Sequence, residues 1–215
     1  MKNILITRIP NNSQELANHL EKQGCKIYFQ PLFKIYQNPL PQNFFINQID
    51  VDLNVIITSA NALWALPQLT NSKSIKIFTV GAQSANLVRQ LGFDQVLYPQ
   101  NWGAQNLSDL ILSHHDSFNI VYLRGEKISY DFKTILLQNN FNYREVSVYK
   151  TQAIDDFSCS IIDLIKQNFF DEILIFSQNS LEIFYKLCVK NNLIEYLNCI
   201  IFLLTLLLFY HFNSF

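Results

Sequence analysis

Short apolar segments with strand patterning alternate with helical segments along most of this 215-residue chain. Residues 54–61 form a strand pattern that passes directly into a helical pattern, and residues 172–184 repeat this arrangement. Strands that alternate with helices of this kind are typical of parallel sheets with helices on both faces. The sequence therefore predicts an α/β fold, and the two copies indicate two similar α/β units.

The clearest strand–turn–helix–strand unit lies in residues 119–151. In its second strand, alternation puts Val146 and Val148 on one face and Ser147 and Tyr149 on the other. Its first strand ends in a glycine-containing turn, and such a turn at the carboxyl end of a parallel strand can face a ligand. Tyr149 is either a functional phenol or an ordinary strand tyrosine, and the pattern alone leaves both open.

Four local predictions depend on proline or capping residues. Ser129 is expected to be the N-cap of the helix that follows it, and Pro67 is expected to end the helix after residues 54–61. The prolines within residues 31–41 indicate a connection between units, and a short apolar helix is expected at residues 44–49.

Charge and motif content exclude several function classes. The formal net charge is −1 and Lys and Arg form no stripe, whereas nucleic-acid binding needs clustered cations. The four cysteines form no CxxC pair, which argues against a zinc site or a disulfide framework and favours reduced thiols in the cytoplasm. His114 and His115 point apart on a helix, so a shared metal is not expected. Nucleotide-binding loops, nucleophile elbows and HExxH motifs are lacking, and we expect no cofactor and no metal.

Three predicted strands end in small hydroxyl or amide residues where a helix begins, at residues 58–61, 81–84 and 177–180. Helix starts with free N–H groups and hydroxyls suit carboxylates or phosphates. Simple N-capping, which stabilises by about 1 kcal/mol, is the better explanation of any single one. Their repetition on one edge favours a pocket for a polyanion. Arg8 and Arg124, which each follow a strand, could bind a carboxylate there or could be ordinary solvated residues. The candidate binding residues are Thr7, Arg8, Thr58, Ser59, Ser84, Arg124, Gly125, Ser177 and Asn179.

The two ends of the chain differ in character. Residues 4–6 are too short for the apolar region of a signal peptide. Residues 199–212 are almost entirely apolar, but a helix of that length would span about 21 Å, short of the roughly 30 Å hydrocarbon core of a bilayer. We expect no membrane span, although this tail could adhere to a membrane.

Six segments of the chain carry a family resemblance: residues 4–8, 56–62, 79–85, 121–125, 146–151 and 175–180. In this order they resemble segments of uroporphyrinogen-III synthase. The resemblance implies two flavodoxin-like α/β domains with parallel sheets, joined by a double chain crossing, with a cleft between them. It places residues 1–35 plus 152–215 in the first domain and residues 36–151 in the second.

The reaction implied by the resemblance is a cofactor-independent lyase reaction of haem biosynthesis, carried out by a cytoplasmic monomer. Hydroxymethylbilane, a linear tetrapyrrole with acetate and propionate carboxylates, loses water and closes to uroporphyrinogen III with ring D inverted. The resemblance places Tyr149 on the functionally implicated tyrosine of the family, where a phenol could donate a proton to the leaving hydroxyl. Other residues fall on or beside substrate-facing positions of the family: Thr7, Arg8, Ser59, Ser84 and Ser177.

The chain departs from the family pattern after residue 203. The family continues with a helix start resembling Gly-Pro-Thr-Thr-Ala, whereas this chain runs through apolar residues. From this departure we expect reduced activity or poor solubility. Two alternatives to the synthase follow: an inactive or merely tetrapyrrole-binding member of the family, and a tail-anchored membrane protein.

Overall fold

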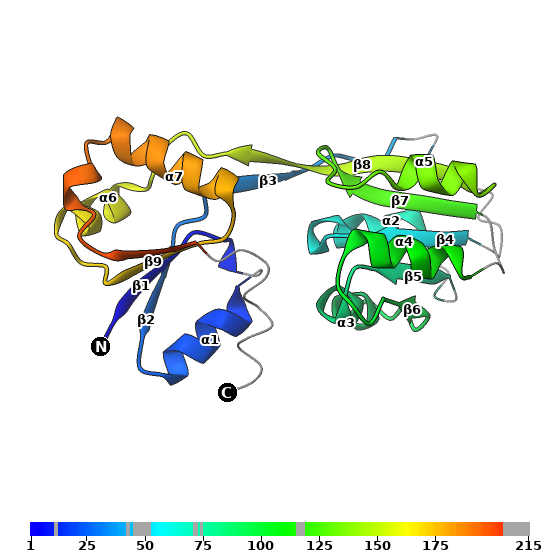
Figure 1. Cartoon of the computed structure of the whole chain (residues 1–215), viewed down its shortest axis with the longest axis horizontal. Coiled ribbons are helices and arrows are strands. Elements are labelled where there is room, and N and C mark those ends of the chain that lie inside the picture. Colours follow the sequence, from blue (N-terminus) through cyan, green and yellow to red (C-terminus); the bar gives the residue numbers. More distant parts are fainter. Residues whose placement is uncertain are drawn as a thin grey trace. The chain divides into compact units, whose positions relative to one another are not determined.

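The computed structural model describes residues 1–10, 13–41, 44, 53–70, 73, 75–114 and 119–203. Its contacts divide the chain into two compact units (Figure 1). Unit 1 takes Met1–Lys34 and the chain from Gln152 onward, and unit 2 is Ile35–Thr151. Apart from Phe44, the short helix predicted at residues 44–49 lies outside the described residues.

Unit 1 contains a four-stranded sheet in the order β10-β9-β1-β2. Its pairings, β10 with β9, β9 with β1 and β1 with β2, are all parallel. The strands are β1 (Asn3–Ile6), β2 (Lys26–Phe29), β9 (Glu172–Ile175) and β10 (Ile200–Leu203), and the helices are α1 (Gln14–Lys22), α6 (Cys159–Lys166), α7 (Gln178–Lys190) and the 3-10 helix η4 (Ile194–Tyr196).

The two faces of the unit 1 sheet bury different residues because strand side chains alternate between faces. Ile4 and Ile6 of β1 share a buried cluster with Ala17 of α1. Leu5, between them, belongs to a second cluster that includes Ile161 of α6 and residues of α7. The helices therefore cover both faces of this parallel sheet.

Unit 2 is built on a six-stranded sheet in the order β3-β8-β7-β4-β5-β6. The chain passes from unit 1 into unit 2 within β3 and returns within β8. The pairings β8–β7, β7–β4, β4–β5 and β5–β6 are parallel. The elements are β3 (Phe33–Gln37), β4 (Leu53–Ile57), η3 (Ala60–Ala65), α2 (Leu66–Leu69), β5 (Lys76–Thr79), α3 (Ala82–Gln90), β6 (Val96–Leu97), α4 (Ala104–Leu112), β7 (Asn119–Gly125), α5 (Phe132–Gln138) and β8 (Asn142–Ala153).

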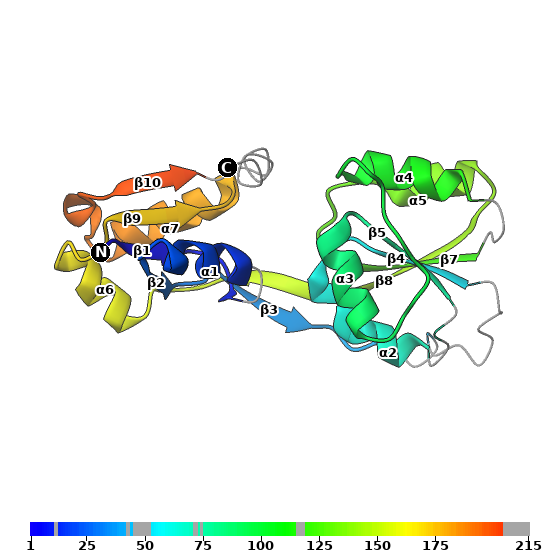
Figure 2. The ribbon, with the colours of Figure 1, turned by 90° about the horizontal axis from the view of Figure 1, so that it is seen from below.

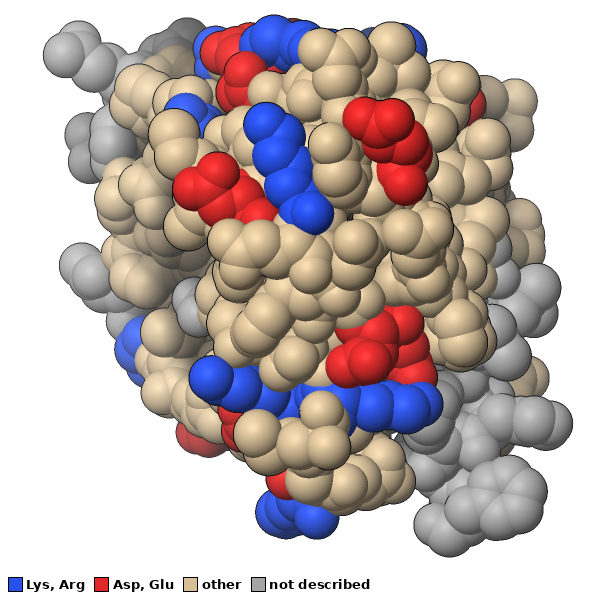
Figure 3. Space-filling view, turned by 90° about the vertical axis from the view of Figure 1, so that its left-hand side faces the viewer, with Lys and Arg blue, Asp and Glu red and all other residues tan. Residues whose placement is uncertain are grey.

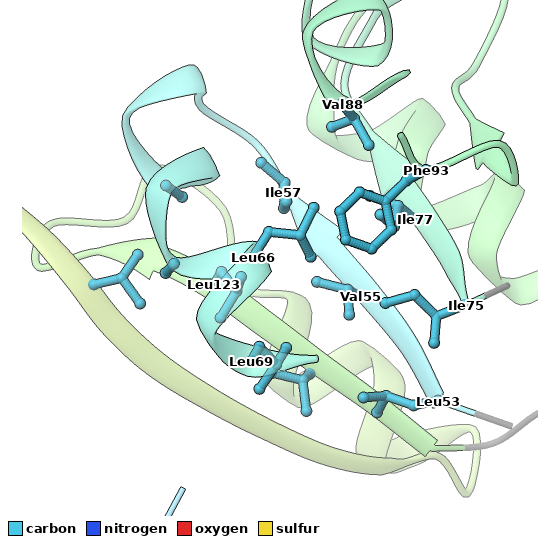
Figure 4. Packing of buried hydrophobic residues seen from close by; sticks show 14 of the residues in the cluster. Leu53, Val55, Ile57, Leu66, Leu69, Ile75, Ile77, Val88, Phe93 and Leu123 are labelled. Carbon is cyan, nitrogen blue, oxygen red and sulfur yellow. The ribbon is translucent and has the colours of Figure 1, made fainter. Parts of the chain in front are cut away.

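Helices cover both faces of the unit 2 sheet, with α4 and α5 on one side and α2 and α3 on the other (Figure 2). On the second side, Val55 and Ile57 of β4 pack with Leu66, Val88 and Phe93 (Figure 4). All five of these side chains are fully buried. The predicted α/β fold with parallel sheets is therefore confirmed.

Two local predictions need correction, and a third was incomplete. The proline-containing stretch does connect the two units, as predicted, but it does so through a strand, β3, which lies beside β8 in the six-stranded sheet. Pro67 does not end a helix: the chain forms the 3-10 helix η3 first, and Pro67 then lies in the first turn of α2, where no backbone N–H is needed. The N-cap of α5 is Asp131, not Ser129, because the Asp131 carboxylate accepts a hydrogen bond from the Thr134 backbone N–H.

The apolar tail begins as a strand. Ile200, Ile201 and Phe202 of β10 are exposed at the edge of the unit 1 sheet, and Ile200 keeps 58% of its surface accessible. Among the described residues, no helix is long and apolar enough to cross a bilayer. Residues 204–212 of the predicted adhesive tail lie outside the described residues.

Candidate functional site

The carboxyl ends of the unit 2 strands bring several predicted binding residues to one edge of the sheet. Ile57 of β4 lies opposite Thr79 of β5 on one side and Leu123 of β7 on the other. The residues that come directly after these three positions therefore lie at the same edge, which is where ligands bind in open parallel sheets. The predicted residues placed there are Thr58, Ser59, Arg124 and Gly125.

The hydroxyls at this edge are partly used within the protein. The Thr58 hydroxyl lies 2.7 Å from the phenolic oxygen of Tyr122, a buried tyrosine whose pKa is raised by burial. Ser59 is the N-cap of η3, and its hydroxyl accepts a hydrogen bond from the Asn61 N–H at 3.3 Å. The capping explanation thus applies to Ser59. The hydroxyl hydrogen of Ser59 could still be donated to a ligand carboxylate.

The start of α3 differs from a simple cap. Its N-cap is Gly81, which makes no side-chain hydrogen bond, and Ser84 lies in the first turn of the helix. A Cβ added at Gly81 would lie 3.1 Å from Cδ1 of Trp102, a half-exposed tryptophan. Glycine therefore permits an aromatic side chain to pack against the backbone at the N-terminus of α3.

Tyr149 packs against Gly125 across the β7–β8 pair. The register runs from Arg124 opposite Ser147 to Gly125 opposite Tyr149, so β8 has one extra residue at this point. Such a bulge changes the direction of the side chains that follow it. Tyr149 packs against the same buried cluster as Val148, so the predicted alternation, which put these two residues on opposite faces, ends here. A Cβ at Gly125 would lie 2.7 Å from the Tyr149 Cζ, a contact that real Cβ atoms do not make. Only glycine lets the ring lie this close to the β7 backbone.

Arg124 is held by groups of the protein itself. Its Nη2 donates to the Glu145 carboxylate at 3.1 Å, and its Nη1 donates to the carbonyl oxygens of Gly125 at 2.9 Å and Glu126 at 3.1 Å. The Tyr143 phenol donates to the other Glu145 oxygen at 2.7 Å. Sequence reasoning missed Glu145 and Tyr143, although their alternation on β8 put both on one face.

The electrostatics of this network favour an ionised carboxylate. Burial opposes ionisation of Glu145, but hydrogen bonds from Tyr143 and Arg124 and the guanidinium charge hold its pKa below the usual value. Burial, and then the hydrogen bond to this carboxylate, raise the pKa of Tyr143 far above its usual range. At neutral pH the network therefore consists of a guanidinium, a carboxylate and an uncharged phenol.

This arrangement predicts a pH-dependent contribution to stability. The folded state lowers the pKa of Glu145, so its stabilisation is full above the unfolded value, about 4.3, and is lost as the pH falls through the folded value. We expect Glu145→Gln to lower the free energy of unfolding by roughly 1 kcal/mol at pH 7. In urea unfolding at a series of pH values, the gap between the two proteins should narrow below about pH 4.5. A gap that widened on acidification would contradict this sign.

Unit 1 places its predicted residues at the carboxyl ends of β1 and β9. Thr7 is buried, and its hydroxyl donates to the Leu174 carbonyl at 2.8 Å, so this side chain joins the two strands. The Arg8 guanidinium lies 4.6 Å above the Phe176 ring, and burial lowers the pKa of Arg8. No carboxylate among the described residues forms an ion pair with it. An anion would supply the missing counter-charge.

The beginning of α7 lies at the same edge of unit 1. Ser177 is its N-cap, and its hydroxyl accepts from the Ser180 N–H at 3.1 Å and lies 2.8 Å from the Ser180 hydroxyl. Asn179 follows in the first turn of the helix. The ten predicted site residues thus form two groups, one on the carboxyl edge of each sheet.

Two further features bear on the ligand class. No group of three or more His, Cys, Asp or Glu side chains in the described part of the chain could hold a metal ion. Figure 3 shows one face of the molecule, on which the described Lys and Arg side chains lie among acidic and uncharged ones. The basic side chains on that face, including a band across its lower part, have acidic side chains directly beside them, which offsets their attraction for nucleic-acid phosphates.

A model of the family described as uroporphyrinogen-III synthase HemD matches residues 14–202 of the chain. Among characterised relatives, the porphyrin biosynthesis protein HemD of Ruminiclostridium josui is 25% identical over 166 residues. The match covers 71% of this chain and 32% of that protein, so the chain spans about a third of this relative's length.

Two solved structures share the fold. A mutant uroporphyrinogen III synthase from Thermus thermophilus has 13% sequence identity and a TM-score of 0.52, covering 95% of this chain and 84% of that one. The uroporphyrinogen-III synthetase from Helicobacter pylori has 18% identity and a TM-score of 0.54, covering 87% and 78%. The family match extends over most of the chain and the fold agrees with it, so the chain belongs to the uroporphyrinogen-III synthase family.

Proposed function

We propose that this chain is a uroporphyrinogen-III synthase that closes hydroxymethylbilane to uroporphyrinogen III, with inversion of ring D and loss of water. Membership of the family supports an enzyme of porphyrin biosynthesis. The observation that carries the proposal further is the placement of the Tyr149 phenol against Gly125 at a strand end, on the sheet edge that also presents Ser59. This edge combines a proton donor with hydroxyl groups for carboxylates.

In the proposed reaction, the residues of the chain hold the substrate and move one proton. Arg8 supplies a half-buried positive charge that forms no ion pair with the described carboxylates, and the helix starts at Ser177 and Ser84 supply N–H and O–H donors for acetate and propionate groups. Holding both ends of a flexible linear tetrapyrrole converts ring closure into a reaction between positioned groups.

Tyr149 is the proposed proton donor to the departing hydroxyl, which leaves as water. The electrophile that remains is attacked by the substituted carbon of ring D, and the spiro intermediate then fragments and closes again with ring D inverted. Thr58 and Asn179 complete the proposed binding group. Thr7 is proposed to act indirectly: its hydroxyl hydrogen-bonds β1 to β9 and so supports the strand end that carries Arg8.

The product isomer tests the proposal directly. Hydroxymethylbilane closes spontaneously without inversion, so isomer I is the background product. We expect the purified protein to shift the product to isomer III, resolved by chromatography after oxidation to the porphyrins. Isomer I alone at saturating protein would overturn the proposal. Calorimetric binding of hydroxymethylbilane without isomer III would instead identify a tetrapyrrole-binding member of the family.

A further inference from the structure

We propose that Arg124 and Glu145 are positioning residues, whose ion pair holds the turn after β7 so that the Tyr149 ring keeps its place. The inference rests on the proposed function, in which the phenol of Tyr149 is the proton donor. It assigns to Arg124 a task other than binding a substrate carboxylate directly.

The first step concerns how Arg124 is used. Nη1 of Arg124 donates to the carbonyl oxygens of Gly125 and Glu126, which lie 2.9 and 3.1 Å from this nitrogen. Nη2 reaches the Glu145 carboxylate, and both side chains are largely buried, with 20% and 26% of their surface exposed. A planar guanidinium can make these contacts together, whereas a lysine could not. The guanidinium therefore connects the turn to the neighbouring strand.

The second step concerns what the turn touches. Gly125 forms the surface on which the Tyr149 ring lies, with no room for even a methyl group between them. The backbone N–H of Glu126 donates to the Tyr149 carbonyl at 2.9 Å. The same two residues whose carbonyls accept from Arg124 thus hold the ring and the backbone of Tyr149. Any shift of the turn is transmitted to the phenol.

The third step concerns why the Arg124–Glu145 pair is rigid. Glu145 accepts from Tyr143 through one oxygen and from Arg124 through the other, so the carboxylate cannot rotate without losing a bond. A carboxylate held by two donors fixes the position of the guanidinium more strictly than a solvent-exposed pair does. Conversion of Glu145 to glutamine preserves the shape, removes the charge and replaces one acceptor with a donor.

The test is a double-mutant cycle on the formation of uroporphyrinogen III. Since displacing a reacting group by about 1 Å can cost 10²-fold, we expect Glu145→Gln to lower kcat by roughly 10- to 100-fold with KM almost unchanged. In a Tyr149→Phe background the same change should have little further effect, because the phenol it positions is already absent. An equal loss in both backgrounds, or a rise in KM with kcat unchanged, would overturn the inference in favour of a separate role.

A matched control removes an ion pair elsewhere. Asp156→Asn breaks the ion pair between Asp156 and Lys190 in unit 1. Its two atoms are 2.8 Å apart, closer than those of the Arg124–Glu145 pair, but its side chains are more exposed. This substitution should leave kcat unchanged. If urea titrations show that Glu145→Gln does not fold, Tyr143→Phe replaces it in the test. This variant removes only the second donor to Glu145, so it should also lower kcat, by a smaller factor.

A readout independent of turnover separates this inference from the proposed function. Fluorotyrosine incorporated at the ten tyrosines gives resonances of which Tyr149→Phe identifies one. That resonance should shift in Glu145→Gln and stay in place in Asp156→Asn. If wild-type protein makes no isomer III, the proposed function fails whatever the spectrum shows. If isomer III forms but the Tyr149 resonance ignores Glu145, the positioning role alone fails.

Discussion

We expect Tyr149→Phe to slow the formation of uroporphyrinogen III by roughly 10²- to 10⁴-fold, the range typical of removing a general acid. The substitution deletes one oxygen and retains the ring that packs on Gly125 and the buried cluster of unit 2. The fold should therefore persist, with a change in the free energy of unfolding of less than about 1 kcal/mol. The measurement is the single-turnover rate of isomer III formation at saturating hydroxymethylbilane.

The control for this prediction is Tyr185→Phe. Tyr185 lies on α7 with 59% of its surface exposed, so losing its hydroxyl should alter neither rate nor stability. The ratio of the two product isomers distinguishes proton donation by Tyr149 from substrate positioning. If Tyr149 positions the substrate, Tyr149→Phe should lower the ratio of isomer III to isomer I at high substrate concentration. An unchanged rate and ratio in Tyr149→Phe would remove this residue from the proposed mechanism.

Periodicity was sufficient to predict the fold class because each element satisfies its own pattern locally. Parallel strands buried on both faces are continuous apolar runs, as in residues 55–57, and the helices between them carry apolar residues at helical spacing. β3 could not be predicted in this way: residues 31–41 do connect the two units, but the prolines on both sides hid the strand within them, and its partner strand lies more than a hundred residues away. Pro67 was wrongly predicted to end a helix. A proline destabilises a helix only where it removes a backbone hydrogen bond, which it does not do in the first turn, and the sequence does not show where the helix begins.

The candidate site was only partly predictable, because strand register and bulges are properties of a pair. Alternation along β7 and β8 puts Tyr122, Arg124, Tyr143 and Glu145 on defined faces, yet it does not say which residues meet across the strands. The observed register places Arg124 opposite Ser147, so Glu145 is its diagonal neighbour. An arginine expected to meet a ligand therefore meets a carboxylate of the protein. The extra residue that brings Tyr149 onto Gly125 likewise exists only in the paired strands.

The second large effect concerns the core of unit 2. Phe93 is fully buried and packs with Val88, Ile77 and Ile75 (Figure 4). The Lys73 ammonium lies 3.8 Å from the centroid of the Phe93 ring. Phe93→Ala removes the ring and leaves a cavity between α3 and β5. We expect it to lower the free energy of unfolding of unit 2 by about 3–5 kcal/mol. Leu137→Ala, at an exposed position on α5, should change it by less than about 0.5 kcal/mol.

Tryptophan emission makes this prediction specific to one unit. The chain has two tryptophans, Trp64 and Trp102, and both belong to unit 2. Trp64 packs against the cluster that contains Phe93, so unfolding of this core should change its emission in a urea titration. Phe184→Ala makes an equivalent change in the separate core of unit 1. It should lower the midpoint seen by circular dichroism, which reports both units, with a smaller effect on the tryptophan midpoint. If Phe184→Ala moved the tryptophan midpoint as far as Phe93→Ala, the two cores would unfold as one cooperative unit.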